Sequence, residues 1–186
     1  MVEFLSDSQA LAAGTATVGW LSRKSLRQPG SHGFYRFFVW EAILGLLVLN
    51  RDFFDSDPSS PGVQVAFLLL LLSIVLALSG LITLYRRGKP SQGRDEQSFY
   101  AFEKTTQLVS SGIFGYIRHP MYSSLLALAW GTYLLNPDLI GTLLVGLASL
   151  FLWLTATTDE KECLAYFGSA YAEYAQRTKR FIPFLF

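Results

Sequence analysis

The chain has 186 residues, of which 51% are hydrophobic and 16% are charged, and its formal net charge is +1. Soluble domains usually carry about 25% charged residues, so the composition indicates a membrane protein. The near-neutral charge gives no basic field for nucleic acid. The single cysteine, Cys163, excludes an internal disulfide and a cysteine-rich metal site, and we expect no bound metal.

Three apolar runs in the first half of the chain predict membrane helices, within a segment of N-terminal spans at 1–84. Residues 10–21 are rich in Ala, Gly and Thr and could form a span or a helix in the membrane interface. Residues 34–49 are apolar but contain Arg36 and Glu41. Residues 63–84 carry no charge and are long enough to cross a hydrocarbon core of about 30 Å.

Two further runs predict a helical hairpin. Residues 121–135 and 139–156 flank the turn sequence Asn136-Pro137-Asp138. No segment shows a strand pattern. We therefore expect one all-α integral-membrane domain over residues 1–186, a multi-pass helical bundle with four spans, or five if residues 10–21 also cross the membrane.

The charges of the connecting segments predict an orientation. Residues 51–62 contain one Arg and three Asp, and the hairpin tip contains only Asp138. Lysine and arginine concentrate in three other segments: 23–27, 86–104 and 161–180. The positive-inside rule then places the polar segments 85–117 and 157–186 together on the cytoplasmic side of a bacterial inner membrane or an endoplasmic reticulum membrane.

The motif GYIRHPMY stands directly before the hairpin. Pro120 suits the first turn of a helix, so Arg118 and His119 should lie at the helix N-terminus, whose free N–H groups favour anions. Arg118 could instead snorkel at the membrane surface, and Tyr116 and Tyr122 could be interfacial anchors.

The C-terminal segment shows a helical periodicity. Residues spaced by three and four form one face: Glu160, Leu164, Phe167, Tyr171, Tyr174 and Thr178. This predicts an amphipathic helix that closes a cytoplasmic cleft, with Gly168 weakening or breaking it. Glu162 is expected to be a solvated charge. A cleft with a carboxylate, tyrosines and a helix N-terminus suits a ligand such as S-adenosylmethionine, among other possibilities.

The stretch LVSSGIFGYIRHPMY resembles the R-H-P-x-Y region of the isoprenylcysteine carboxyl methyltransferase family and is similar to segments of membrane phospholipid methyltransferases. The later elements of the family pattern follow in order: Asp159-Glu160, Phe167-Gly168, Tyr171, Tyr174, Lys179, Arg180 and Pro183. The resemblance covers residues 105–186, which we expect to form the methyltransferase core.

This resemblance implies an S-adenosyl-L-methionine-dependent enzyme that methylates a lipophilic acceptor from the bilayer. Its implied cofactor-binding residues are Gln107, Leu108, Val109, Gly112, Tyr116, His119, Pro120, Met121, Tyr122, Asp159 and Glu160. Glu160 would bind the cofactor's amino group. Arg118 would orient the second substrate or structure the loop, so Arg118 and Glu160 are the expected catalytic residues.

The acceptor remains open among a prenylcysteine carboxyl group, a phospholipid amine, a thiol and an isoprenoid. Thr155 stands where some prenylcysteine enzymes have an arginine, so a substrate carboxylate would lack that partner. Membrane NADPH-dependent sterol or steroid reductases share an R-H-x-x-Y segment and are an alternative. A non-catalytic membrane scaffold with the same fold is another.

Overall fold

The computed structural model describes residues 6–52, 56–89 and 105–185. Within these ranges the regular structure is helical, apart from isolated β-bridge residues, which confirms the predicted all-α class. The α-helices are α1 (Asp7–Ser22), α2 (His32–Leu49), α3 (Pro61–Arg87), α4 (Pro120–Leu135), α5 (Leu139–Phe167) and α6 (Ser169–Arg177). Two short 3₁₀ turns are η1 (Ser25–Arg27) and η3 (Gly112–Gly115).

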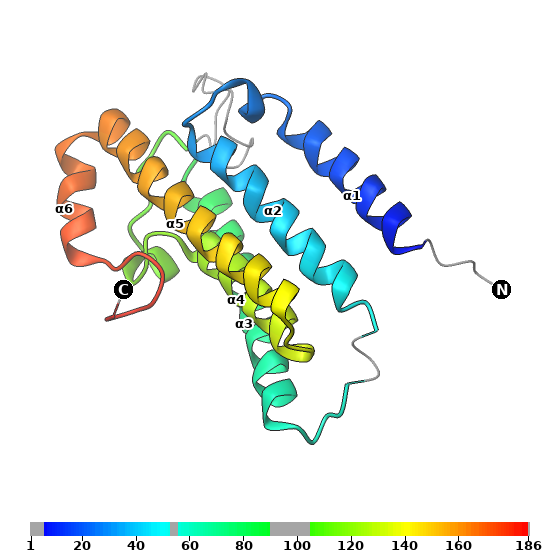
Figure 1. Ribbon diagram of the computed structural model, residues 1–186. Helices are drawn as coiled ribbons and strands as arrows, with labels where there is room; N and C mark the ends of the chain where they lie inside the picture. Colours follow the sequence, from blue (N-terminus) through cyan, green and yellow to red (C-terminus); the bar gives the residue numbers. More distant parts are fainter. Residues whose placement is uncertain (1–5, 53–55, 90–104, 186) are drawn as a thin grey trace.

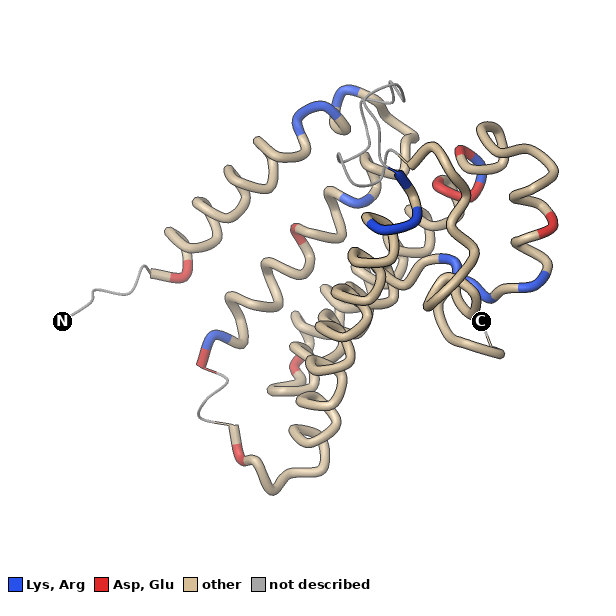
Figure 2. Tube along the Cα trace, turned by 180° about the vertical axis from the view of Figure 1, so that it is seen from behind, with Lys and Arg blue, Asp and Glu red and all other residues tan. Residues whose placement is uncertain are grey.

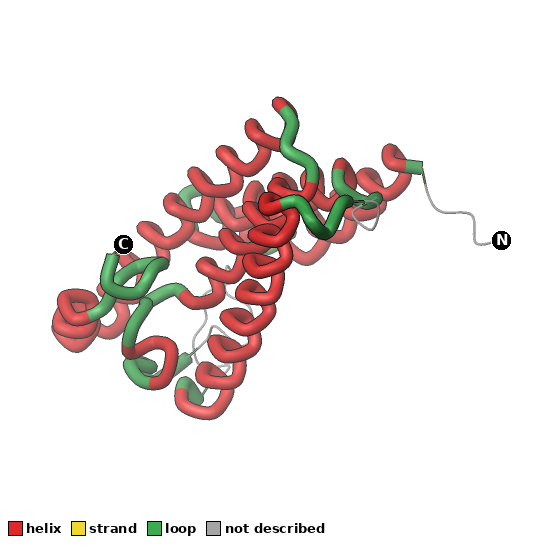
Figure 3. The backbone as a smooth tube through the Cα atoms, turned by 90° about the horizontal axis from the view of Figure 1, so that it is seen from below, coloured by secondary structure: helices red, strands yellow, loops and turns green. Residues whose placement is uncertain are grey.

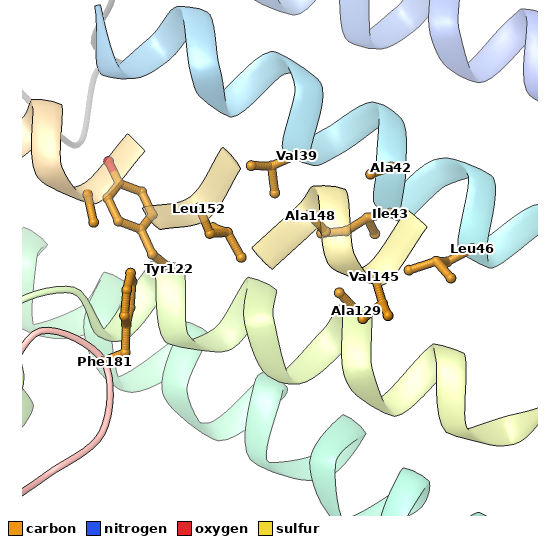
Figure 4. Close-up of a cluster of buried hydrophobic side chains, with 11 residues drawn as sticks. Val39, Ala42, Ile43, Leu46, Tyr122, Ala129, Val145, Ala148, Leu152 and Phe181 are labelled. Atoms are coloured by element: carbon orange, nitrogen blue, oxygen red, sulfur yellow. The ribbon is translucent and has the colours of Figure 1, made fainter. Parts of the chain in front are cut away.

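Helices α2 to α5 form an elongated bundle in which α2 packs along α5 and α3 packs along α4 (Figure 1). The small residue Gly131 of α4 permits the second contact, because a Cβ there would lie 3.1 Å from the carbonyl oxygen of Ala66. Buried apolar side chains of α2, α4 and α5 make the core (Figure 4): Val39, Ala42, Ile43, Leu46, Ala129, Val145, Ala148 and Leu152.

Helices α2, α3 and α5 are each long and apolar enough to cross a membrane, which supports an integral membrane protein. The sequence predicted four such spans. Helix α4 is shorter, with 16 residues, or roughly 24 Å at 1.5 Å per residue. It starts at Pro120, as predicted, and forms the expected hairpin with α5.

The sequence left the position of α1 open. In the structure, α1 lies alongside α2 and antiparallel to it (Figure 1). Arg51, just after α2, forms an ion pair with Asp7 at the start of α1. Midway along the pair, the Thr15 hydroxyl donates to Glu41 Oε2 at 2.8 Å. Helix α1 therefore extends along the wall of the bundle rather than across its end.

The amphipathic face predicted for the C-terminal segment is divided between two helices at Gly168, which is one of the two outcomes expected there. Helix α5 continues without interruption from the hairpin to Phe167 and ends at Gly168, which adopts φ 60° and ψ −135°. A left-handed φ of this kind favours glycine. Helix α6 then turns away and buries Tyr171 and Tyr174 on its inner face.

The charged residues are distributed unevenly along the bundle (Figure 2). Lysine and arginine gather toward the end where α3 finishes, α4 begins and the C-terminal tail lies. The opposite end carries Arg51 together with Asp7, Asp52, Asp57 and Asp138. The loop before α4 and the tail after α6 therefore both lie at the basic end of the molecule.

Candidate active site

The loop before α4 and the tail after α6 lie side by side at the basic end (Figure 3). Their backbones pair in parallel: Arg118 N donates to the Lys179 carbonyl at 2.7 Å, and His119 N donates to the Arg180 carbonyl at 3.1 Å. Lys179 N donates back to the Tyr116 carbonyl at 3.1 Å. The two polar segments that the charge pattern placed on one side of the membrane are thus joined directly.

Glu160 is the centre of an ion-pair network that holds this junction together. Its Oε1 accepts from Arg118 Nε at 2.9 Å and from Arg180 Nε at 3.0 Å, and its Oε2 accepts from Arg180 Nη2 at 2.7 Å. His119 Nε2 lies 3.2 Å from Oε1. The hydrogen bond to Glu160 raises the pKa of the Arg180 guanidinium. Two guanidinium groups therefore already neutralise the Glu160 carboxylate.

Arg118 also binds the end of α6. Its Nη1 donates to the Ala175 carbonyl at 2.9 Å and to the Thr178 carbonyl. These are carbonyls of the last turn, which lack partners within the helix. The Arg118 side chain is only 11% exposed, so it does not snorkel at the membrane surface. Its contacts support the loop-structuring role among those expected from the resemblance.

Asp159, the neighbouring acid on α5, has a different environment. The Tyr122 hydroxyl donates to its Oδ2 at 3.1 Å, and His119 Nδ1 lies 3.6 Å from the same oxygen. The His119 ring stacks on Tyr122 with centroids 5.1 Å apart. Within the described ranges, no lysine or arginine forms an ion pair with Asp159.

A cavity opens beside Asp159, with an empty volume of about 730 Å³ that includes part of the open solvent. Its walls come from the end of α3, the loop before α4, the start of α4, the polar part of α5, and α6. The lining residues are Leu84, Thr105, Leu108, Val109, Phe114, Arg118, His119, Pro120, Met121, Tyr122, Asp159, Cys163, Phe167, Tyr171 and Tyr174.

Two tyrosines of α6 form the aromatic wall of this cavity. Burial raises the pKa of both the Tyr171 and the Tyr174 phenols, so both stay neutral at physiological pH. The Tyr174 hydroxyl donates to the Phe114 carbonyl at 2.8 Å. This bond connects α6 to η3, and both residues line the cavity.

Most of the expected site residues line this cavity together: Leu108, Val109, Arg118, His119, Pro120, Met121, Tyr122 and Asp159. Gln107, Gly112, Tyr116 and Glu160 lie outside the lining. The Tyr116 side chain is 58% exposed and makes an edge contact with Phe184. Gly112 adopts φ 64° and shapes the turn into η3.

The sequence predicts no role for several residues at this end. Arg180 appeared only within the basic stretch of the family pattern, and nothing in its spacing indicated a contact with Glu160. The expectation that Glu162 is a solvated charge was wrong, because its Oε2 lies 2.6 Å from Nδ1 of the buried His32. Ligand-type atoms of His32, Asp159 and Glu162 lie within 4.8 Å of one another. No periodicity could have connected residues so far apart in sequence.

Comparisons with known proteins find matches over part of the chain. The sequence profile of the phospholipid methyltransferase family matches residues 62–169, which include α3, the cavity loop, α4 and α5. A Schizosaccharomyces pombe protein, Protein-S-isoprenylcysteine O-methyltransferase, is 35% identical over 82 residues, or 42% of this chain. That match spans about a third, 34%, of the relative's own length. No solved structure matches the chain.

Proposed function

The chain belongs to the phospholipid methyltransferase family, and from this premise we propose that it transfers a methyl group from S-adenosyl-L-methionine to a lipophilic acceptor in the bilayer. The observation that carries the proposal is the cavity at the basic end. There the family-like loop, the start of α4 and the acidic part of α5 meet around one carboxylate, that of Asp159. The positive-inside rule favours a cytoplasmic position for this end.

The residues of the cavity fit this cofactor chemically. S-adenosyl-L-methionine supplies a methyl group on a sulfonium, which leaves as a neutral thioether. Asp159 would hold the cofactor's ammonium group, because a carboxylate without a guanidinium partner favours a cation. Aromatic faces of Phe167 and Tyr171 suit the sulfonium and the purine ring. The backbone of Leu108 and Val109 would line the cofactor, as the resemblance implies.

We assign Asp159 the role that the resemblance gives to Glu160. Glu160 already accepts hydrogen bonds from Arg118 and Arg180 and does not line the cavity. A ligand ammonium would have to displace a guanidinium to reach it. Glu160 and Arg118 therefore act by fixing the tail against the loop, so that the cavity keeps its shape for an aligned transfer.

His119 would handle any proton that the acceptor releases. It lines the cavity between the two acids, with Nε2 near Glu160 and Nδ1 near Asp159. A carboxylate or thiolate acceptor needs no base, whereas an amine must lose a proton around the transfer. Whether His119 acts as a base thus depends on the methyl acceptor, which a direct assay should identify.

The assay uses the detergent-purified full chain with methyl-labelled S-adenosyl-L-methionine. Separate reactions would contain an amine-headgroup phospholipid, a prenylated cysteine, a long-chain thiol or an isoprenoid. We expect label to enter one lipid fraction with wild-type protein and to be absent when the protein is omitted. The proposal would be contradicted if no lipid fraction were labelled and S-adenosylhomocysteine also failed to protect Cys163.

The single cysteine gives a direct measure of occupancy, because Cys163 lines the cavity. S-adenosylhomocysteine should slow maleimide labelling of Cys163 saturably, and NADPH should not. Protection by NADPH instead would favour the reductase alternative. Protection by neither, with an unchanged melting temperature, would favour a non-catalytic scaffold.

A further inference from the structure

A partly buried contact next to the cavity joins the start of α2 to the polar part of α5. Glu162 Oε1 accepts from the backbone N–H of His32 at 3.1 Å, and Glu162 Oε2 lies 2.6 Å from His32 Nδ1. The His32 side chain is 1% exposed, and that of Glu162 is 26% exposed. The Glu162 carboxylate thus contacts both the backbone N–H and the ring of His32.

This contact acts as a helix cap supplied by another helix. His32 is the first residue of α2, where backbone N–H groups lack partners within the helix and the dipole favours a negative charge. The Ser31 hydroxyl accepts from Phe34 N at 3.1 Å and caps one of these groups. Glu162 satisfies another, so the first turn of α2 is completed by a side chain of α5.

The same contact fixes the part of α5 that carries the cavity acid. Asp159 and Glu162 are three residues apart, so their side chains lie on neighbouring positions of one helical face. The buried residues of α5 extend only as far as Ala156. Beyond that residue, the contact between Glu162 and His32 adds to the ion pairs of Glu160 in fixing the rotation of α5, and hence the direction of the Asp159 carboxylate.

Hydrogen bonding explains this geometry better than a shared metal ion does. Two ligand atoms about 2.1 Å from one ion are separated by roughly 3 Å or more. The 2.6 Å between His32 Nδ1 and Glu162 Oε2 is shorter than this and corresponds to a short hydrogen bond to a carboxylate.

We propose that His32 and Glu162 are a positioning pair for the methyl-donor site, which holds Asp159 toward the cavity by capping α2 from α5. The inference rests on the proposed function, because Asp159 must be the residue that binds the cofactor's cation. Neither His32 nor Glu162 lines the cavity. Their effect on the ligand is therefore indirect, through the orientation of α5.

Two substitutions of His32 distinguish the hydrogen bond from its Nδ1 to Glu162 from the space that the ring fills. His32→Asn places an amide N–H near the position of Nδ1, whereas His32→Gln places it near the position of Nε2. Glu162→Gln removes the charge, and Glu173→Gln on the exposed face of α6 is the matched control. For each variant we would measure the dissociation constant of S-adenosylhomocysteine, its protection of Cys163, and the melting temperature without ligand.

We expect His32→Asn and Glu173→Gln to bind like the wild type. His32→Gln and Glu162→Gln should bind about ten-fold more weakly, as expected for a lost hydrogen bond to a charged group. Equal affinity of the two His32 variants would overturn the proposal. Loss of folded protein from His32→Asn would also overturn it, since the ring would then serve stability alone. A wild type that binds no S-adenosylhomocysteine would contradict the proposed function itself.

Discussion

Helix α5 has two halves that are stabilised in different ways. From the hairpin to Ala156 its buried residues are small or aliphatic, including Val145, Ala148 and Leu152, and they pack against α2 and α4. Beyond Ala156 the same helix carries Asp159, whose Oδ2 has its partners on α4 and in the loop before it.

The polar half depends on a few specific partners, some of them far away in the sequence. Glu160 binds Arg118, which is 42 residues distant, and Glu162 binds His32, which is 130 residues distant. The apolar half depends on many contacts of similar kind. We therefore expect substitutions in the apolar half to lower stability without changing ligand affinity, and substitutions in the polar half to affect ligand binding as well.

The largest expected effect on stability comes from Glu160→Ala in the polar half. The substitution leaves the guanidinium groups of Arg118 and Arg180 together without their common carboxylate. Removing one partner of a largely buried ion pair costs about 3 kcal/mol of unfolding free energy. Thermal melting in detergent should show this loss, whereas an unchanged melting temperature would mean that the network does not hold the tail.

In the apolar half, Leu152→Ala should lower the unfolding free energy by about 2 kcal/mol, because it leaves a cavity in the core. Leu152 is 1% exposed. The matched control is Leu143→Ala on the same helix, where the side chain is 61% exposed and should matter little. Both variants should keep the wild-type affinity for S-adenosylhomocysteine. A large loss of affinity in Leu152→Ala would contradict the division between the two halves.

A smaller effect is expected for Tyr174→Phe, which removes the hydrogen bond to the Phe114 carbonyl. The expected cost is about 1 kcal/mol at neutral pH. Because burial raises the pKa of Tyr174, the unfolded chain releases this proton near pH 10 while the folded protein keeps it. Stability should then fall as pH rises above about 10.

Denaturant titrations between pH 7 and pH 11 would check this prediction. The fall in stability should be less steep in Tyr174→Phe than in the wild type, since one of the buried phenols is missing. A wild type and a variant with the same pH dependence would show that Tyr174 does not titrate differently in the folded and unfolded states.

The sequence predicted the apolar half well, and the reason is physical. Uninterrupted hydropathy and the turn Asn136-Pro137-Asp138 determine the hairpin locally, and Pro120 begins α4 as expected. The length of α5 was underestimated, because its polar residues end the hydropathy signal at Ala156 although the helix continues. The break at Gly168 was anticipated as one of two outcomes.

The polar half was predicted only in part. The motif identified Arg118, His119, Tyr122 and the acidic pair, but not which acid faces the cavity. That distinction depends on Arg180, which reaches Glu160 only because the tail pairs with the loop before α4. Such an arrangement is a property of the folded chain and leaves no periodic pattern in the sequence.

The central claim is that Asp159 provides the negative charge of a methyl-donor site. Calorimetric titration of S-adenosyl-L-methionine into wild-type protein and Asp159→Asn, with Glu173→Gln as control, tests it most directly. We predict saturable binding to the wild type and the control. Binding to Asp159→Asn should be at least about ten-fold weaker, at an unchanged melting temperature. Equal binding to wild type and Asp159→Asn would contradict the account.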